Sequence, residues 1–419
     1  MSPRPAAAEV SPVTADCAMI GPAAVRDAVD RFRNVYQTDP AMAASAPGRV
    51  NLIGEHLDYN GGPVLPVALD RRTAVAVSAG AGWTFTSTAH AKTATVSSGL
   101  ALTGEWTDYL VGVLQELRAR GFTLPGARVA VASNVPIGAG LSSSAALTVA
   151  ATAALGELAG RTIAPAELVA IAFAAEHDRV GVRCGRMDQT IAAHAREGHA
   201  LFLETATGAF RHTPLPVPVW VLETGTSHRL AGGELNQRRQ ECESALAICR
   251  AVKPTLTHLA ALTPPELPAV RALLEEPLFR RVRHVVTEVA RTRAAAEALD
   301  AGDLPRLGSL LLEGHASLLR DYESTVGEAD FLVDAAVRHG AYGARLTGAG
   351  WGGAVVMLAA PANAPSIVQK IQADFLRIYD RPLTAWPTLA GPGVRTEHSD
   401  GWIPSGLELP GGRRPVPGT

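Results

Sequence analysis

The stretch that decides the fold is VPIGAGLSSSAAL, residues 135–147. Before it, ARVAVAS (127–133) alternates with period two and predicts a strand. After it, SAALTVAATAALGELAG (144–160) predicts a helix that ends at Gly160. A glycine turn at a helix N-terminus is suited to an anion, because the first turn presents free N–H groups and the positive end of the macrodipole. A structural turn with a serine N-cap explains the same residues.

The common nucleotide-binding motifs do not match this loop. A Walker loop needs Gly-Lys-Ser/Thr, and no lysine lies between Lys92 and Lys253. A dinucleotide fingerprint needs glycine or alanine where Ser143 stands, and an acidic residue at the end of the following strand. An oxidoreductase is therefore disfavoured, and any phosphate would be bound by backbone amides and hydroxyls.

Length and composition limit the classes of protein that remain. A chain of 419 residues is longer than a single hydrophobic core usually supports, so we expect two domains. A net charge of −2 gives no reason to expect nucleic acid or an anionic membrane as a partner. The four cysteines include no C-x-x-C pair and are expected to be reduced thiols. No apolar run reaches the roughly 18 residues of a membrane span, so a cytoplasmic protein is expected.

The chain alternates strand and helix patterns in two parts, with a cleft expected between them. Residues 1–22, rich in Ala and Pro, are expected to be a disordered leader, and the Pro/Gly-rich residues 399–419 a disordered tail. Further strands are predicted at RVNLI (49–53), TAVAVSA (73–79) and HALFLE (199–204). Further helices are predicted at 165–181, 236–252, 280–299 and 304–320.

Polar side chains gather in APGRVNLIGEHLDYNGG, residues 46–62. Glu55, His56 and Asp58 lie within four residues, too close on a turn to surround one metal ion easily. A row of hydrogen-bonding groups for a polyhydroxylated ligand explains the spacing better. The segment CGRMDQ (184–189) adds a further carboxylate, Asp188.

These stretches, together with GARLTGAGWGG (343–353), resemble the motifs of the GHMP small-molecule kinases, and GRVNLIGEHLDYNGG narrows the resemblance to the galactokinase family. The likeness spans roughly Ala46 to Leu358. It implies a two-domain α+β fold, with a domain like ribosomal S5 domain 2 over 23–205, a ferredoxin-like domain over 206–398, and the active site between them. It also implies transfer of the ATP γ-phosphoryl group to the anomeric hydroxyl of galactose, giving galactose 1-phosphate and ADP. Mg²⁺ is the implied cofactor, and we expect a monomer.

The resemblance also assigns roles residue by residue. Asp188 matches the catalytic base, and Arg49 matches an arginine that stabilises charge; a carboxylate can accept the sugar proton as the new bond forms, and a guanidinium keeps it ionised. The sugar-binding set is Glu55, His56, Leu57, Asp58 and Asp188. The ATP-binding set is Gly138, Ala139, Gly140, Leu141, Ser142, Ser143 and Ser144, with Trp106 and Tyr109 at the adenine. The magnesium ligands are Ser144 and Glu176. Core packing is an alternative role for Trp106 and Tyr109.

Two positions depart from the family pattern. Leu57 stands where the family usually has threonine, and Leu235 stands where it has a sugar-contacting tyrosine. The second change leaves open a related sugar as substrate: N-acetylgalactosamine, galactosamine or L-arabinose. Non-catalytic galactose and ATP sensors share this fold but carry an altered serine loop. The intact SSSAA, with Arg49, Glu176 and Asp188, favours an enzyme.

Overall fold

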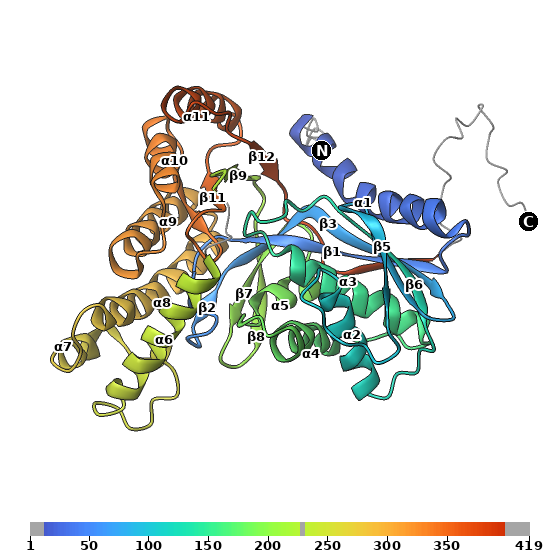
Figure 1. The fold of residues 1–419 in the computed structure, drawn as a ribbon. Coiled ribbons are helices and arrows are strands. Elements are labelled where there is room, and N and C mark those ends of the chain that lie inside the picture. The colour runs from blue at the N-terminus through green and yellow to red at the C-terminus, as the bar shows by residue number, and fades with distance from the viewer. Residues whose placement is uncertain (1–11, 227–230, 399–419) are drawn as a thin grey trace, which may run out of the picture.

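The computed structural model describes residues 12–226 and 231–398 (Figure 1). Its largest sheet has six strands in the order β13-β1-β3-β6-β4-β5. Neighbouring strands are antiparallel except β4 and β6, which are parallel. The strands are β1 (Met42–Asn51), β3 (Pro66–Ala79), β4 (Trp83–Ser87), β5 (His90–Val96), β6 (Ala127–Ser133) and β13 (Arg395–His398).

Both faces of this sheet are buried, and β3 shows how alternation separates them. Ala74 and Ala76 face helix α1 (Pro12–Tyr36), whereas Val75 and Val77 belong to the core on the opposite face. Side chains two residues apart share a face of a strand. The small alanines let α1 pack closely, and Phe32 fills the space between them.

The opposite face carries the helices that hold the glycine loop and several of the predicted site residues (Figure 1). They are α2 (Asp108–Ala119), α3 (Ser143–Leu158), α4 (Pro165–Ala174) with the π-helical turn η1 (Ala175–Val180), and α5 (Met187–His194). Helix α3 has buried residues on all its sides, which its alanine-rich sequence permits. Its N-terminus lies at the end of the glycine loop that follows β6.

The second part of the molecule is a four-stranded antiparallel sheet with helices on its two faces. On β11, Val356 and Leu358 pack in the core shared with α9, while Val355 and Met357 pack in the core shared with α10 and α11. The strands are β10 (Gly343–Thr347), β11 (Ala354–Leu358), β9 (Val219–Glu223) and β12 (Ala385–Thr388). The helices are α6 (Ala231–Cys249), α7 (Leu267–Arg271), α8 (Leu278–Asp300), α9 (Leu304–Ser317), α10 (Gly327–Arg338) and α11 (Ala364–Tyr379).

Short elements complete the fold. A three-stranded sheet is formed by β2 (Pro63–Val64), β7 (His199–Glu204) and β8 (Ala209–Pro214). Single helical turns are η3 (Leu259–Ala261), η4 (Pro264–Glu266) and the π-helical η5 (Leu318–Tyr322).

The strands and helices predicted from the sequence are present, with several differences. The strand predicted at 49–53 is the end of β1, which stops at Asn51, and the helix predicted at 304–320 ends as the π-helical turn η5 after Ser317. Helix α1 begins at Pro12, so the expected leader is wrong for residues 12–22, while residues 1–11 and the expected tail 399–419 lie outside the described residues. The predicted helix 165–181 continues from α4 as the π-helical turn η1. The expected domain boundary at 205/206 falls in the turn between β7 and β8, and β13 returns to pair with β1 of the first sheet.

Two further expectations concern the whole chain. Cys184, Cys242 and Cys249, the cysteines with described side chains, are free thiols. In the part of the chain that the structure describes, no helix combines the length and apolarity needed to cross a bilayer.

Candidate active site

An arginine–carboxylate pair lies where the first sheet meets the glycine loop. Arg49, in β1, donates from Nε to Oδ1 of Asp188 at 2.7 Å and from Nη2 to Oδ2 at 2.8 Å. Its third nitrogen, Nη1, donates to the carbonyl of Gly140 at 2.6 Å. Both side chains are largely buried, with 8% and 22% of their surfaces exposed. The two-point geometry fixes the carboxylate and keeps a positive charge beside it.

The glycine loop reaches the same carboxylate. Ser142 donates from Oγ to Oδ2 of Asp188 at 2.5 Å. It is the N-cap of α3 and adopts a left-handed conformation with φ 57°, which is uncommon for a residue with a side chain. Gly138 and Gly140 also have positive φ values, which glycine adopts without steric cost, so glycines stand where the backbone of the loop needs them. One oxygen of Asp188 therefore lies at the start of the loop expected to hold phosphate.

The loop is anchored by the apolar members of the predicted ATP-binding set. Ala139 and Leu141 are buried in the core beneath the loop, so only their backbone could contact a nucleotide. Ser143 and Ser144 are half-buried at the first turn of α3. These positions leave backbone amides, glycines and hydroxyls at the surface of the loop, the groups suited to an anion.

Glu176 lies close to Ser144. Its Oε1 accepts hydrogen bonds from Thr148 Oγ1 at 2.8 Å and from Gln189 Nε2 at 2.9 Å, and the Ser144 side chain also bonds to the carboxylate. Burial raises the pKa of Glu176, and these hydrogen bonds oppose the rise. Glu176 is on the π-helical turn η1, a distortion that is frequent at functional sites.

The pair Ser144 and Glu176 fits a magnesium ion by its chemistry. A hydroxyl and a carboxylate are hard oxygen ligands, and Mg²⁺ usually takes one or two protein ligands and completes its shell with phosphate and water. No group of three or more His, Cys, Asp or Glu side chains that could hold a metal occurs among the described residues. The donor set therefore suits a nucleotide-bound ion better than an all-protein metal site.

Asp58 lies near Asp188 and close to Gly185 of the same segment. Burial raises the pKa of Asp58 to about 6, and the charge of Asp188 adds to this effect while Arg49 opposes it. A Cβ on Gly185 would lie 2.0 Å from Oδ2 of Asp58, so only glycine leaves room for this carboxylate. The segment CGRMDQ thus contributes twice. Gly185 leaves room for the carboxylate of Asp58, and Asp188, in the first turn of α5, provides a second carboxylate beside it.

Glu55 belongs to a buried network of charges that the sequence did not predict. Its Oε2 lies 2.5 Å from Nη2 of Arg345, and Arg345 Nη1 lies 2.8 Å from Oε1 of Glu288. Burial raises the pKa of Glu55 to about 7; Arg345 opposes the rise, and the neighbouring Glu288 adds to it. Oε1 of Glu55 has no hydrogen-bond partner among the described residues. A buried oxygen without a partner can accept a hydrogen bond from a ligand hydroxyl.

The imidazole of His56 is hydrogen-bonded through Nδ1, while its Nε2 has no partner among the described residues. His56 has a φ of 65° and is buried. Its Nδ1 is hydrogen-bonded to the hydroxyl of Tyr59 at 2.8 Å, and its ring stacks on Tyr322 with centroids 4.1 Å apart. Nε2 is buried and has no hydrogen-bond partner within the described ranges. Burial lowers the pKa of His56 well below its usual value, so the ring is neutral.

Leu57, between His56 and Asp58, has a different environment from its neighbours. Its side chain is completely buried in the core of the second part of the molecule. A sugar bound here could therefore contact only the backbone of Leu57. The usual threonine of the family is replaced here by a residue that packs.

The two aromatic residues of the expected adenine site have separate surroundings. Trp106 stacks on His90, with ring centroids 5.1 Å apart and planes at 4°, and lines a cavity of about 680 Å³ beside β5. Tyr109 is half-buried, and burial raises the pKa of its hydroxyl, helped by the nearby charge of Glu176. Trp106 thus lies at an open cavity, whereas Tyr109 lies near Glu176.

The second glycine-rich stretch joins the two parts of the molecule at this site. Gly348, after β10, has φ 85°, and a Cβ there would lie 3.0 Å from the carbonyl oxygen of Gly140. Trp351 donates its backbone N–H to Ser324 at 2.7 Å, and its ring lies 6.0 Å from that of His56. The predicted motif therefore lies between the glycine loop, which Gly348 approaches, and His56, which Trp351 approaches.

Leu235, the departure from the family pattern, lies in the N-terminal part of α6 and is half-buried. Arg238, three residues further along, is at the histidine end of the site, since its guanidinium lies 5.7 Å from the Trp351 ring centroid. Residues three apart share a helix face. Leu235 is thus on the side of α6 that faces this end of the site.

The residues that were not predicted from the sequence contact the predicted site residues directly. The signal for Arg345 was an arginine inside the apolar strand GARLT, since a buried charge requires a partner. Tyr322 and Gln189 gave no comparable signal, because each acts through a contact with a residue far away in the chain or on another helix.

Comparisons with known proteins agree with this geometry. Residues 30–79 match the galactokinase galactose-binding signature, residues 108–196 the GHMP kinases N terminal domain and residues 295–376 the GHMP kinases C terminal model. The chain is 40% identical over 383 residues to a galactokinase of Chloroflexus aggregans, which covers 87% of this chain and 95% of that protein. It is 38% identical over 321 residues to a galactokinase of Thermotoga maritima, covering 76% and 89%.

Solved structures agree as well. The crystal structure of Lactococcus lactis galactokinase complexed with galactose superposes with a TM-score of 0.83 at 28% identity, covering 88% of this chain and 98% of that one. A mevalonate kinase of Methanococcus jannaschii, at a TM-score of 0.61 and 16% identity, shares the fold. The two-domain α+β fold expected from the sequence is confirmed, and the chain belongs to the galactokinase family of the GHMP kinases.

Proposed function

We propose that this protein transfers the γ-phosphoryl group of ATP to the anomeric hydroxyl of galactose, giving galactose 1-phosphate and ADP. One observation carries the proposal. Asp188 is hydrogen-bonded to Ser142 of the glycine loop and lies near Asp58 of the predicted sugar-binding stretch. A carboxylate between a phosphate loop and a row of hydroxyl-binding groups is placed to act where a sugar hydroxyl would meet a phosphoryl group.

Asp188 is the proposed catalytic base. A sugar hydroxyl is a weak nucleophile, and a positioned carboxylate can accept its proton while the oxygen–phosphorus bond forms. Arg49 fixes the carboxylate by two hydrogen bonds and places a guanidinium beside the position of the transferring group. That positive charge can stabilise the negative charge that develops on the equatorial oxygens.

The sugar would be held by Glu55, His56 and Asp58. Each offers a polar atom that is suited to a hydroxyl: Oε1 of Glu55 and Nε2 of His56 are buried without a partner, and Asp58 lies next to the base. Binding a polyhydroxylated ligand would satisfy these atoms, which otherwise carry the cost of desolvation. The geometry supports a sugar, and the galactokinase relatives support galactose over the amino sugars and L-arabinose.

The nucleotide would bind along the glycine loop. Backbone amides of residues 138–144 and the N-terminus of α3 would hold the phosphates, so no Walker lysine is required. Ser144 and Glu176 would hold Mg²⁺, which, when bound, neutralises charge on the phosphates during transfer. The 680 Å³ cavity beside Trp106 is the proposed place for the adenine.

A non-catalytic sensor is the second candidate, and the structure argues against it. A sensor does not need a positioned base, yet Asp188 is held by three hydrogen bonds from two side chains. We further propose a cytoplasmic monomer, since one chain supplies every residue of the proposed site that the structure describes.

The test is a coupled assay of ADP release with a sugar panel. Galactose should support turnover well above N-acetylgalactosamine, galactosamine and L-arabinose. Tight binding of galactose and ATP with no ADP release above the rate without sugar would favour the sensor. Faster turnover of one of the other sugars would replace galactose as the substrate.

A further inference from the structure

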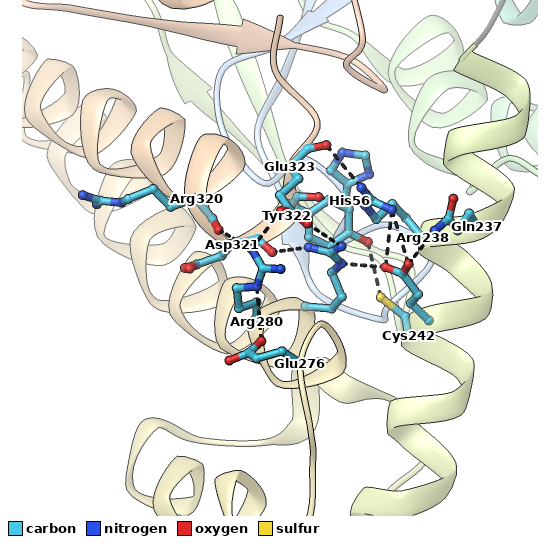
Figure 2. A network of polar contacts seen from close by, with 12 residues as sticks. His56, Gln237, Arg238, Cys242, Glu276, Arg280, Arg320, Asp321, Tyr322 and Glu323 are labelled. Carbon is cyan, nitrogen blue, oxygen red and sulfur yellow. Dashed lines mark hydrogen bonds and ion pairs between the residues drawn. The ribbon is translucent and has the colours of Figure 1, made fainter.

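A chain of side-chain hydrogen bonds reaches His56 from the side away from its free nitrogen. The hydroxyl of Tyr59 is 2.8 Å from His56 Nδ1 and 2.7 Å from the hydroxyl of Tyr322. The Tyr322 hydroxyl is 3.3 Å from Sγ of Cys242. Asn60 donates from Nδ2 to the same sulfur at 3.7 Å. Figure 2 shows His56, Tyr322 and Cys242 of this chain, which spans the loop after β1, helix α6 and the turn η5.

Asn60 fixes one end of the chain. Its amide nitrogen also donates to the backbone carbonyl of His56 at 2.8 Å, and a carbonyl can only accept. The nitrogen, and not the oxygen, of the Asn60 side chain therefore faces this side. The sulfur of Cys242 accepts from it and keeps its own S–H to donate. Burial raises the pKa of the Cys242 thiol, which keeps that proton in place.

The direction of the remaining bonds follows from the acceptor strengths. If Cys242 donates to Tyr322, then Tyr322 donates to Tyr59, and Tyr59 donates to Nδ1 of His56. The chain then ends on an imidazole nitrogen, a strong acceptor. The opposite direction would end on a thiol sulfur, a weak acceptor, which would have to accept a second bond. A neutral imidazole whose Nδ1 accepts a hydrogen bond carries its proton on Nε2.

We propose that Tyr59, Tyr322 and Cys242 are positioning residues that hold His56 as the Nε2–H tautomer, so that it donates a hydrogen bond to an oxygen of the sugar. The inference rests on the proposed function for the identity of the ligand, but the tautomer itself does not depend on it. The consequence is a rule of specificity: the sugar must present an acceptor to His56. A hydroxyl or ether oxygen meets this rule, and an ammonium group does not.

Tyr322 is the best position for a test, because its ring is held independently of its hydroxyl. The ring stacks on His56, with planes at 23°, and the Tyr322 carbonyl accepts from Arg238 Nε at 2.8 Å. Arg281 donates to the preceding carbonyl, that of Asp321, at 2.6 Å. Tyr322→Phe should therefore keep the backbone and the stacked ring and lose only the hydroxyl. Tyr36→Phe is the matched control, since it removes a tyrosine hydroxyl that bonds to Thr84 in the first domain.

The tautomer can be measured without turnover. Long-range ¹H–¹⁵N correlation spectra of the full chain, labelled with ¹⁵N-histidine, distinguish a protonated from an unprotonated ring nitrogen. The His56→Asn variant assigns the signals by their loss. We expect His56 to have an unprotonated Nδ1 and a protonated Nε2 in the parent, and a mixture of both tautomers in Tyr322→Phe. A protonated Nδ1 in the parent, or an unchanged spectrum in Tyr322→Phe, would overturn the proposal.

Kinetics give the second readout. Tyr322→Phe should raise the KM for galactose by about 3- to 10-fold, the effect of weakening one hydrogen bond. The KM for ATP should stay within twofold, and Tyr36→Phe should change neither constant. If Tyr322→Phe raises both KM values equally, the hydroxyl is structural and the proposal fails. If the parent shows the Nε2–H tautomer but does not phosphorylate galactose, the proposed function fails and the hydrogen-bond chain stands.

Discussion

Replacing Asp188 by asparagine tests the proposed base, and the structure gives the size of each effect. The carboxylate accepts three hydrogen bonds, two from Arg49 and one from Ser142. Asparagine has the same shape but one acceptor oxygen, so one of the two Arg49 bonds is lost in either orientation of the amide. A hydrogen bond to a charged group contributes about 1.5–3 kcal/mol, so a moderate loss of stability is expected.

The loss of rate should be larger than the loss of stability. An amide cannot accept the sugar proton, and removal of a positioned base costs on the order of 10²–10⁴-fold in rate. At about 1.36 kcal/mol per factor of ten, this corresponds to about 3–5.5 kcal/mol of transition-state stabilisation. The fold and the glycine loop should persist, so ATP binding should be retained.

The assay compares Asp188→Asn with Asp39→Asn. Asp39 is exposed between α1 and β1 and pairs with Arg33, so the control makes the same chemical change at an arginine-paired aspartate away from the site. The kcat is measured by ADP release, ATP affinity by titration calorimetry, and stability by thermal unfolding. A kcat within threefold of the parent, with normal ATP binding, would refute Asp188 as the base.

Three further predictions test the metal ligands, the sugar carboxylate and the family departure. Ser144→Ala and Glu176→Ala should each raise the Mg²⁺ concentration for half-maximal activity at saturating ATP; an unchanged value in both would remove them from the metal site. Because burial raises the pKa of Asp58 to about 6, its accepting carboxylate is lost as the pH falls through 6, so the KM for galactose should rise there in the parent but not in Asp58→Asn. The sign for stability is opposite: a pKa above the usual 3.8 means that ionised Asp58 destabilises the fold above pH 6, so Asp58→Asn should raise the Tm at pH 8 and not at pH 4. Leu235→Tyr should lower the KM for galactose by about fivefold or more by restoring a hydroxyl near the sugar, and an unchanged KM would show that Leu235 does not face it.

Local sequence patterns were sufficient to predict the strands and the loop on which several site residues lie. β3 and β6 were predicted because their apolar residues alternate, and the glycine loop because its position between a strand and a helix suits an anion. Helix α1 was not predicted from the sequence. Its buried residues Ala24, Ala28 and Phe32 recur every four residues, which is the signal that an amphipathic helix gives.

The supporting shell could not be predicted in the same way. Arg345 contacts Glu55 across a separation of 290 positions in the sequence, and Tyr322 contacts His56 from a π-helical turn that follows α9. Such contacts depend on how two sheets and their helices pack, which periodicity does not encode. The burial of Leu57 is different, since an apolar side chain between polar neighbours is itself a signal for a buried position.

The central claim is transfer of a phosphoryl group to the anomeric oxygen of galactose, and the product tests it most directly. The full chain is incubated with ATP, Mg²⁺ and galactose, and the reaction is followed by ³¹P nuclear magnetic resonance with proton coupling, alongside ADP release. We predict one new phosphate monoester, coupled to the anomeric proton and formed in equal amount to ADP, and no such signal from Asp188→Asn over the same time. A phosphate ester on another carbon, or ADP formed without any sugar phosphate, would contradict it.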